Sequence, residues 1–237
     1  MNIVLFVKEI VPPFIWKLIK KLKKKPKYFG LKYLDMKLEK YLNYNDGYFI
    51  ELGANDGISQ SNTLYFEKNK NWKGILIEPI LHKYIECKKK RSLKNKFFCN
   101  ACVSFDFKEK FVKLLYSNLM TIPTNLESDI NDKFEHANHS NTIRKHKEDV
   151  IEFYSKAKTL NSLLIESKSP KNIDFLSIDV EGSEIEVLKG IDFQEYKFKF
   201  ILIESRNIEK ISNFLSEHDY KLIEKLSYHD YLFGTGA

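Results

Sequence analysis

The chain has 237 residues, of which 43% are hydrophobic and 14% aromatic. This length and composition suffice for one substantial core and fit a single α/β domain. Three cysteines are too few for a disulfide framework, which excludes the small disulfide-stabilised secreted classes. We expect no secretory signal, because Lys8 and Glu9 interrupt the first apolar run, and we predict a cytoplasmic protein.

The formal net charge of +7 lies in residues 1–27, which hold eight lysines and one glutamate. Because the remaining chain is neutral, it lacks the charge of a nucleic-acid-binding groove, and we expect no nucleic-acid partner. Within residues 1–27 the apolar side chains recur at helical spacing, and most lysines fall on the opposite side. The pattern predicts a basic amphipathic helix that binds an anionic membrane surface or, alternatively, packs on the domain or a partner chain. No apolar run reaches the length of about 18 residues expected of a spanning helix.

The most informative segment is residues 49–57, FIELGANDG, which follow a short polar turn. A strand over residues 49–52 delivers the chain into a loop with Gly53 and Gly57, and residues 59–69 predict a helix. Glycine reaches positive φ and allows backbone N–H groups to come close to a ligand. The order of strand, glycine loop and helix is typical of a nucleotide-type cofactor site.

Two residues indicate which cofactor this loop binds. The dinucleotide fingerprint requires glycine where this chain has Asn55, and Glu51 suits the ammonium of an amino-acid tail better than a pyrophosphate. The next predicted strand ends in Glu78, 21 residues beyond Gly57, where a carboxylate can bind both hydroxyls of a ribose. Together these features indicate S-adenosylmethionine, an adenosine with a methionine tail and no phosphate.

The rest of the chain alternates between predicted helices and strands. We expect helices over 80–93, 159–166, 183–190 and 207–217, and strands over 96–103, 173–180, 198–204, 221–225 and 228–233, with a hairpin within 105–116. This alternation predicts a doubly wound α/β fold. We divide the chain into an arm, 1–45, and a domain, 46–237, in which the weakly periodic residues 117–154 form a substrate-side insertion or lid.

Three of the predicted core strands end in carboxylates, namely Glu78, Asp179 and Glu204. In an open parallel sheet the ligand lies beyond the carboxyl ends of the strands, so we expect these acids at one edge of the cofactor crevice. Asn100 and Ala101 lie where the strand over 96–103 ends, within reach of an adenine.

The segments ELGANDG, ILIEP and DVEGSEIEVLKG occur in an order and spacing that resemble the FkbM-type methyltransferases over residues 47–233. The resemblance implies a class I methyltransferase fold, with seven strands of which the last is antiparallel, and transfer of a methyl group to a hydroxyl, often on a sugar. The cofactor contacts that it implies here, together with the strand ends above, are Glu51, Gly53, Ala54, Asn55, Asp56, Gly57, Glu78, Pro79, Asn100, Ala101 and Asp179. Asp179, Glu181 and Gly182 would flank the methionine and the acceptor.

The expected acceptor is a sugar or surface glycan, because family members with a short basic, proline-containing arm resemble enzymes of bacterial surface-glycan assembly. A non-sugar small molecule and a cofactor-binding protein without catalysis stay open as alternatives. A hydroxyl is a poor nucleophile, so its methylation needs a base or a metal ion. The candidate bases are Asp179, Glu181, His136, His139 and His146. Alternatively, Asp179 and Glu204 could hold a divalent cation.

Five further charged or aromatic residues are considered for a functional role. Arg91 and Trp72 are expected to be structural. Arg144 and its neighbours Lys145 and Lys147 could bind a phosphate-bearing or acidic acceptor, although a run of charges on a loop is usually only solvated.

Overall fold

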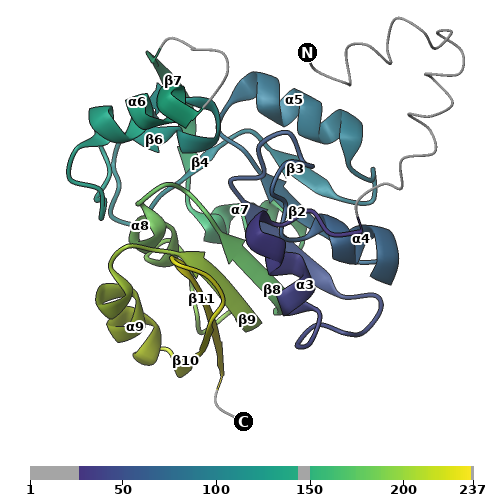
Figure 1. The fold of residues 1–237 in the computed structure, drawn as a ribbon. Coiled ribbons are helices and arrows are strands. Elements are labelled where there is room, and N and C mark those ends of the chain that lie inside the picture. Colours follow the sequence, from purple (N-terminus) through teal and green to yellow (C-terminus); the bar gives the residue numbers. More distant parts are fainter. Residues whose placement is uncertain (1–26, 144–149, 236–237) are drawn as a thin grey trace, which may run out of the picture.

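The computed structural model describes residues 27–143 and 150–235 (Figure 1). Its centre is a seven-stranded sheet with the order β10-β11-β9-β8-β1-β2-β3. Strands β3, β2, β1, β8 and β9 are parallel, and β11 is antiparallel to both of its neighbours. The strands are β1 Tyr48–Leu52, β2 Lys73–Ile77, β3 Lys96–Phe98, β8 Asn172–Ile178, β9 Lys197–Glu204, β10 Tyr220–Lys225 and β11 Asp230–Thr235. The prediction of a doubly wound seven-stranded sheet with an antiparallel last strand is confirmed.

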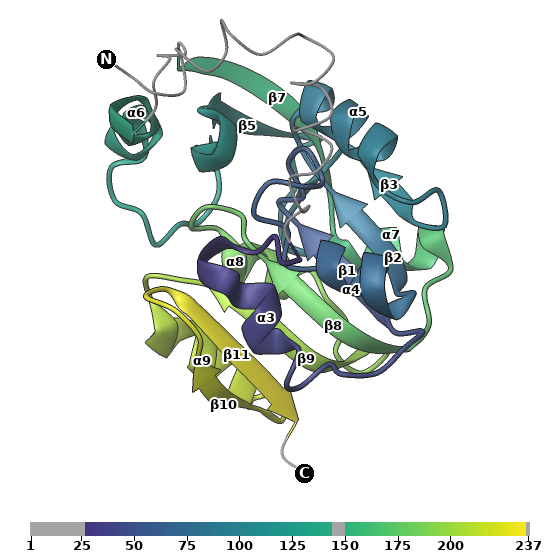
Figure 2. The same cartoon turned by 45° about the vertical axis from the view of Figure 1, so that its right-hand side comes forward.

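Helices cover both faces of this sheet, which explains why its central strands are continuous apolar runs. On one face lie α7 Leu160–Ser167, α8 Glu184–Leu188 and α9 Ile208–Ser216. On the other face lie α3 Leu34–Leu38, α4 Leu64–Lys70 and α5 Leu81–Lys90, with α3 and α4 on the near side in Figure 2.

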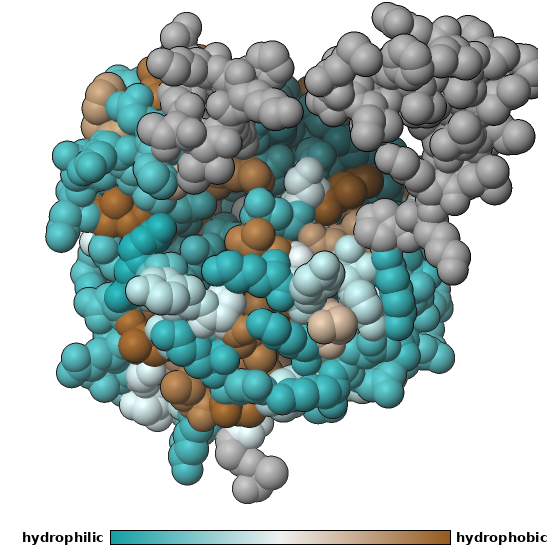
Figure 3. All heavy atoms as spheres, in the orientation of Figure 1, coloured by the Kyte–Doolittle hydropathy of each residue, from teal (hydrophilic) through white to brown (hydrophobic). Residues whose placement is uncertain are grey.

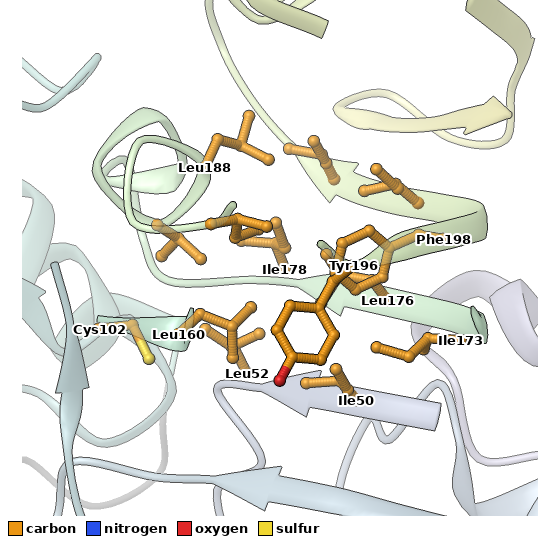
Figure 4. Close-up of a cluster of buried hydrophobic side chains, with 14 of the residues drawn as sticks. Ile50, Leu52, Cys102, Leu160, Ile173, Leu176, Ile178, Leu188, Tyr196 and Phe198 are labelled. Atoms are coloured by element: carbon orange, nitrogen blue, oxygen red, sulfur yellow. The ribbon is translucent and has the colours of Figure 1, made fainter. Parts of the chain in front are cut away.

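The larger hydrophobic core lies between β1, β8 and β9 and the first set of helices. Figure 4 shows Ile50 and Leu52 of β1 and Leu176 of β8 directed toward Leu160 and Leu188 of the covering helices. All five side chains are buried. This core fixes the strands at whose carboxyl ends the candidate site lies.

Part of the segment assigned to the arm packs on the opposite face of the sheet. Leu34, Leu38 and Leu42 are buried in one cluster with Phe49 of β1 and the indole of Trp72. The Trp72 Nε1–H donates to the backbone carbonyl of Tyr44, a contact that agrees with the structural role expected of this tryptophan. Residues 28–44 therefore build the domain core rather than project from it.

The chain after β3 departs from the sequence expectation. The predicted strand 96–103 is two short strands, β3 and β4 Ala101–Cys102, and β4 pairs with β7 Ile151–Lys158 instead of the main sheet. The break falls at Asn100, whose side-chain amide donates to the carbonyl of Lys156. The prediction of one continuous strand over 96–103 was therefore wrong.

The second sheet has the order β4-β7-β5-β6, with β5 Phe111–Tyr116 and β6 Ile122–Pro123. The short helix η2 Asn118–Met120 and the helix α6 Lys133–Ile143 lie between these strands along the chain. Figure 1 shows β4, β6, β7 and α6 gathered beyond one end of the main sheet. The segment 117–154 thus carries secondary structure that its weak periodicity did not indicate.

Residues 1–26, which carry most of the predicted amphipathic helix, lie outside the described residues. Among the residues described, no helix has both the length and the apolar character needed to cross a bilayer. The face in Figure 3 is mostly hydrophilic, with its apolar residues in small separate groups.

Candidate cofactor and methyl-transfer site

The glycine loop after β1 is folded tightly against two neighbouring strands. Gly53 has φ +77°, and a Cβ there would collide with the backbone oxygen of Asp179 at the end of β8. The N–H groups of Gly53 and Ala54 both lie 3.1 Å from the carbonyl oxygen of Ile77, the last residue of β2. Glycine is therefore required at this position, because the loop backbone runs directly beside the ends of β2 and β8.

Glu78 is held at the end of β2 by the same loop. The backbone N–H of Asn55, at φ +44°, donates to Glu78 Oε2 over 2.7 Å, and the N–H of Ile80 donates to Oε1 over 2.8 Å. Burial raises the pKa of Glu78 to about 7, although these two hydrogen bonds favour the carboxylate. Each carboxylate oxygen keeps a lone pair for a further donor such as a ribose hydroxyl.

Glu51 occupies a different place from the one predicted. Its carboxylate accepts hydrogen bonds from Ser61 Oγ, the Asn62 N–H and Thr63 Oγ1, and lies 3.1 Å from Arg91 Nη1. The Glu51 side chain does not line the cavity, so it does not offer its carboxylate to the ammonium of a cofactor. It anchors the segment between the glycine loop and α4.

Arg91 is the cation that balances Glu51. Its side chain is fully buried, and besides Glu51 it binds Glu67 Oε2 at 2.9 Å, the carbonyl oxygen of Gly57 at 3.2 Å and Thr63 Oγ1 at 2.9 Å. A Cβ at Gly57, where φ is +78°, would lie 2.8 Å from Arg91 Cγ. The structural role expected of Arg91 agrees with these contacts, which fix both ends of the glycine loop.

Asp56 shapes the turn rather than the cavity wall. Its Oδ1 accepts the N–H groups of Ile58 and Ser59 at 3.0 and 2.7 Å, and its Oδ2 lies 2.9 Å from Lys90 Nζ. Partial burial raises the pKa of Asp56, but these hydrogen bonds outweigh it and lower the pKa to about 2. Asp56 is therefore a carboxylate that closes the loop on α5.

A cavity of about 360 Å³ opens beyond the carboxyl ends of β1, β2, β8 and β9. This volume is within the range of small-molecule sites. The predicted cofactor residues that line it are Gly53, Asn55, Glu78, Pro79, Asn100, Ala101 and Asp179. The predicted residues that do not line it are Glu51, Ala54, Asp56 and Gly57.

On the β8 and β9 side, the cavity wall carries two interacting carboxyl groups. Burial and the neighbouring charge of Glu204 raise the pKa of Asp179 well above its ordinary value, and a hydrogen bond between the two carboxyl groups acts in the same direction. Two carboxylates in contact cannot both ionise easily, so the protonated form of Asp179 is favoured beside Glu204.

Glu181 lies next to this pair and is bonded to a histidine from the insertion. His136 Nε2 of α6 and Glu181 Oε2 are 2.8 Å apart. Burial raises the pKa of Glu181, while the hydrogen bond to His136 opposes that shift. Glu181 lines the cavity and His136 does not, so the histidine contacts the Glu181 carboxylate from outside the cavity.

The backbone at Glu181 is unusual, with φ +55° in a residue that is not glycine. Glu184 supports this conformation, because its Oε1 accepts the N–H groups of Gly182 and Val180 at 3.0 and 3.3 Å. Such strained positions concentrate at functional sites, where the surroundings hold them. Glu184 therefore fixes the direction in which Glu181 faces the cavity.

The remaining candidates from the sequence lie elsewhere. His139 of α6 is exposed and does not line the cavity. His146, Arg144, Lys145 and Lys147 lie outside the described residues. Within the described part of the chain, no group of three or more histidine, cysteine, aspartate or glutamate side chains is arranged to hold a metal ion. The divalent cation proposed for Asp179 and Glu204 is thus without support from a built ligand set.

Several cavity residues were not found from the sequence. The loop Asn118–Met120, with Leu126 after it, forms an apolar wall opposite the strand ends. Ser183 is 1% exposed, and its hydroxyl has no hydrogen-bond partner among the described residues. Arg206 lines the cavity two residues after β9. Ser183 lies within the DVEGSEIEVLKG segment, which marked this turn but not the serine itself, whereas Arg206 has no periodic or motif signal.

The strand order, the glycine loop after β1 and the acid after β2 define a class I methyltransferase of the type that uses S-adenosylmethionine. The profile of the Methyltransferase FkbM domain matches residues 51–231. The chain therefore belongs to the FkbM methyltransferase family, as its sequence motifs predicted.

Two solved structures are similar to the chain. One is a precorrin-6y C5,15-methyltransferase from Geobacter metallireducens GS-15, with 10% identity, a TM-score of 0.41, and coverage of 85% of this chain and 86% of that chain. The other is a methyltransferase FkbM from Methylobacillus flagellatus KT, with 13% identity, a TM-score of 0.42, and coverage of 85% and 53% respectively. The chain thus spans about half the length of that second protein. No curated protein matches the sequence.

The cavity suits S-adenosylmethionine at both of its ends. Glu78 offers a preorganised carboxylate at the end of β2, and Asn100 and Ala101 line the wall beside it. Gly53 has no side chain, so its backbone borders the cavity directly. A Cβ at this position would collide with the backbone oxygen of Asp179. At the other end, Asp179 and Glu181 line the cavity with carboxyl oxygens that can accept hydrogen bonds from an ammonium group.

Proposed function

We propose that the chain transfers a methyl group from S-adenosylmethionine to a hydroxyl of a sugar or surface-glycan acceptor. The observation that carries this proposal is the pairing of Glu181 with His136 at 2.8 Å, with Glu181 on the cavity wall. A hydroxyl must lose its proton as it attacks, so its methylation benefits from a positioned base. A neutral amine carries a free lone pair and has less need of one.

The cofactor half of the cavity would hold S-adenosylmethionine through Glu78 at the ribose and the Gly53 backbone at the methionine end. When bound, the cofactor supplies a methyl group activated by its sulfonium charge. The residues of the chain position the two reactants and exclude water from between them. Leu119 and Met120 of the insertion supply the apolar side of that enclosure.

On the acceptor side, Glu181 takes the proton of the attacking hydroxyl. His136 keeps the Glu181 carboxylate in place and holds its pKa down, so the base is ionised at a lower pH than burial alone would allow. The raised pKa of Asp179 favours its protonated form, which would offer a donor beside the acceptor oxygens of Glu204 for neighbouring hydroxyls. A polyhydroxylated acceptor matches this mixture better than an apolar one.

A methyl-transfer screen over glycans, free sugars and nucleotide sugars with labelled S-adenosylmethionine tests the proposal. We expect transfer to at least one hydroxyl acceptor, and a loss of at least about a hundredfold in kcat for Glu181→Gln with unchanged cofactor binding. Glu135→Gln on the exposed side of α6 is the matched control. Transfer only to amines or to non-sugar alcohols would refute the sugar proposal, and cofactor binding without any transfer would favour a non-catalytic protein.

We also propose that residues 1–27 attach the enzyme to the anionic inner face of the membrane. The support is the sequence alone: residues 1–27 carry a net charge of +7, and Lys17, Lys20, Lys21 and Lys24 lie opposite the apolar side of an amphipathic pattern. Sedimentation with vesicles that contain anionic lipid, for the full chain and for a variant with the eight lysines changed to glutamine, tests this. Equal sedimentation of the two proteins would exclude electrostatic membrane binding by this segment.

A further inference from the structure

We propose that Arg206 selects acceptors that carry an anionic group, a carboxylate or a phosphate, next to the hydroxyl that is methylated. This inference rests on the proposed function and adds the chemical class of the acceptor. It identifies Arg206 as the residue that determines specificity at the acceptor end of the cavity.

The first observation is where Arg206 stands. It follows the end of β9 by two residues and lines the same cavity as Glu181 and Glu204. Arg206 is exposed, whereas Glu78 is buried in the cavity wall. The guanidinium is therefore accessible from solvent to an acceptor that binds in the cavity.

The second observation is that the backbone of Arg206 is fixed. Asp129 Oδ2 accepts the N–H of Arg206 at 2.7 Å, the N–H of Asn207 at 3.1 Å and the hydroxyl of Ser205 at 3.1 Å. The N–H of Asp129 in turn donates to the carbonyl of Gly182 over 2.9 Å. Asp129 thus ties the turn after β9 to the turn that carries Glu181, which fixes the backbones of the two residues relative to each other.

The third observation is that the guanidinium of Arg206 is not engaged by the nearby acids. Of the described residues, none places a carboxylate oxygen within 4.0 Å of it, and no side chain accepts a hydrogen bond from it. Its charge is nevertheless close enough to lower the pKa of Glu181. In contrast, Lys189 and Lys210 of this region are paired, since both form salt bridges with Glu127.

A guanidinium presents five donors in a plane and binds carboxylates and phosphates through two parallel hydrogen bonds. The carboxylates of Glu181 and Glu204 would repel a free anion from the interior of the cavity. An anionic acceptor is therefore oriented, with its charged group at Arg206 and its hydroxyl toward Glu181. Uronic acids and sugar phosphates, including nucleotide sugars, have this combination of groups.

The test uses matched sets of acceptors that differ only in charge. Each set holds a neutral hexose, the corresponding hexuronic acid and the hexose 1-phosphate, in the gluco, galacto and manno series. Methyl transfer is measured by kcat/KM, and binding is measured by calorimetry in the presence of S-adenosylhomocysteine. The uronic acids and the phosphates distinguish the two sources of the anionic group.

We expect an anionic member to be preferred over its neutral counterpart by at least about tenfold, and Arg206→Gln to remove that preference by raising KM about ten- to a hundredfold. The control Lys221→Gln removes an exposed charge on β10, away from the cavity, and is expected to change nothing. The affinity for S-adenosylmethionine should be the same in all three proteins.

Three results would overturn the inference: equal use of neutral and anionic acceptors, binding of the anionic members that is equal in Arg206→Gln, or no binding of any anionic member. A weaker affinity for S-adenosylmethionine in Arg206→Gln would assign the guanidinium to the cofactor carboxylate instead. If anionic sugars bind through Arg206 and none is methylated, the proposed methyl transfer fails, while the role of Arg206 in binding an anionic group stands.

Discussion

The backbone N–H of Asn55 donates to Glu78 Oε2 over 2.7 Å, although the two residues are 23 positions apart. This bond joins the glycine loop after β1 to the end of β2. The N–H of Ile80 holds the other carboxylate oxygen. The carboxylate of Glu78 is therefore oriented before a ligand enters, which lowers the entropy cost of binding one.

Glu78→Gln is expected to weaken the binding of S-adenosylmethionine about ten- to a hundredfold. The amide keeps the size of the side chain but replaces a charged acceptor, and hydrogen bonds to charged groups contribute about 1.5 to 3 kcal/mol. Calorimetric titration with S-adenosylmethionine, and with NAD as the comparison ligand, measures the change. An unchanged affinity, or tighter binding of NAD than of S-adenosylmethionine by the parent protein, would contradict the assigned cofactor site.

The raised pKa of Glu78, about 7, also gives cofactor binding a pH dependence. In the free enzyme the folded state holds this proton more tightly than the unfolded chain, so this residue's contribution to stability falls as the pH rises from about 4.5 to about 7. Ribose hydroxyls favour the ionised form, so the affinity should rise over pH 6 to 7 and level off above. Glu78→Gln should remove the part of the pH dependence of cofactor affinity that Glu78 causes. An identical pH dependence in both proteins would show that another group causes it.

The sequence predicted the parallel strands, because strands that are buried on both faces are long apolar runs. It also predicted the position of Glu78, because the polar residue at the end of such a run lies at the edge of the sheet where ligands bind. It misplaced Glu51. Phe49 and Glu51 are two residues apart in β1 and so share one face of the sheet, which α4 and α5 cover. The partner that neutralises Glu51 there, Arg91, is 40 positions away. No local pattern indicates such a pairing.

The second sheet was missed for a related reason. Its strands β4 and β6 have two residues each, and β7 pairs with β5 across the whole insertion. Such short strands owe their existence to tertiary pairing rather than to a periodic sequence. The pairing of His136 with Glu181 depends on the same long-range packing. The sequence alone therefore could not distinguish His136 from His139 as a candidate catalytic residue.

Arg91→Met is expected to lower the free energy of unfolding by about 3 to 5 kcal/mol, because it leaves Glu51 and Glu67 buried without a cation. Urea denaturation of the apoprotein measures the loss. Lys88→Met, at an exposed position of α5 just before Arg91, is the control and should change stability by less than about 0.5 kcal/mol. The double variant Arg91→Met with Glu51→Gln should lose less than the sum of the single losses. A loss under about 1 kcal/mol for Arg91→Met alone would show that the buried pair is not needed.

His136→Asn is expected to move the acid limb of the kcat/KM profile to higher pH. The hydrogen bond from His136 lowers the pKa of Glu181, so its removal lets burial raise that pKa further. Because the base works in its ionised form, activity then appears only at higher pH, and kcat at neutral pH should fall about tenfold or more. A profile measured for Glu135→Gln on the same helix should match the parent. A limb that shifts in His139→Asn and not in His136→Asn would contradict this assignment.

Methyl transfer is expected to proceed at an unchanged rate after dialysis against a chelator. The base in the proposed reaction is Glu181, and the Asp179 carboxyl group, hydrogen-bonded to Glu204, has a pKa raised well above its ordinary value by burial and the nearby acids. A hard cation needs ionised oxygen ligands, so its binding at Asp179 would have to overcome that raised pKa. The comparison is between the dialysed enzyme with and without added Mg²⁺ or Mn²⁺, in the parent and in Glu204→Gln. Activity that is lost on chelation, restored by the ion in the parent and not restored in Glu204→Gln would assign a metal to this pair and remove Glu181 from its role as the base.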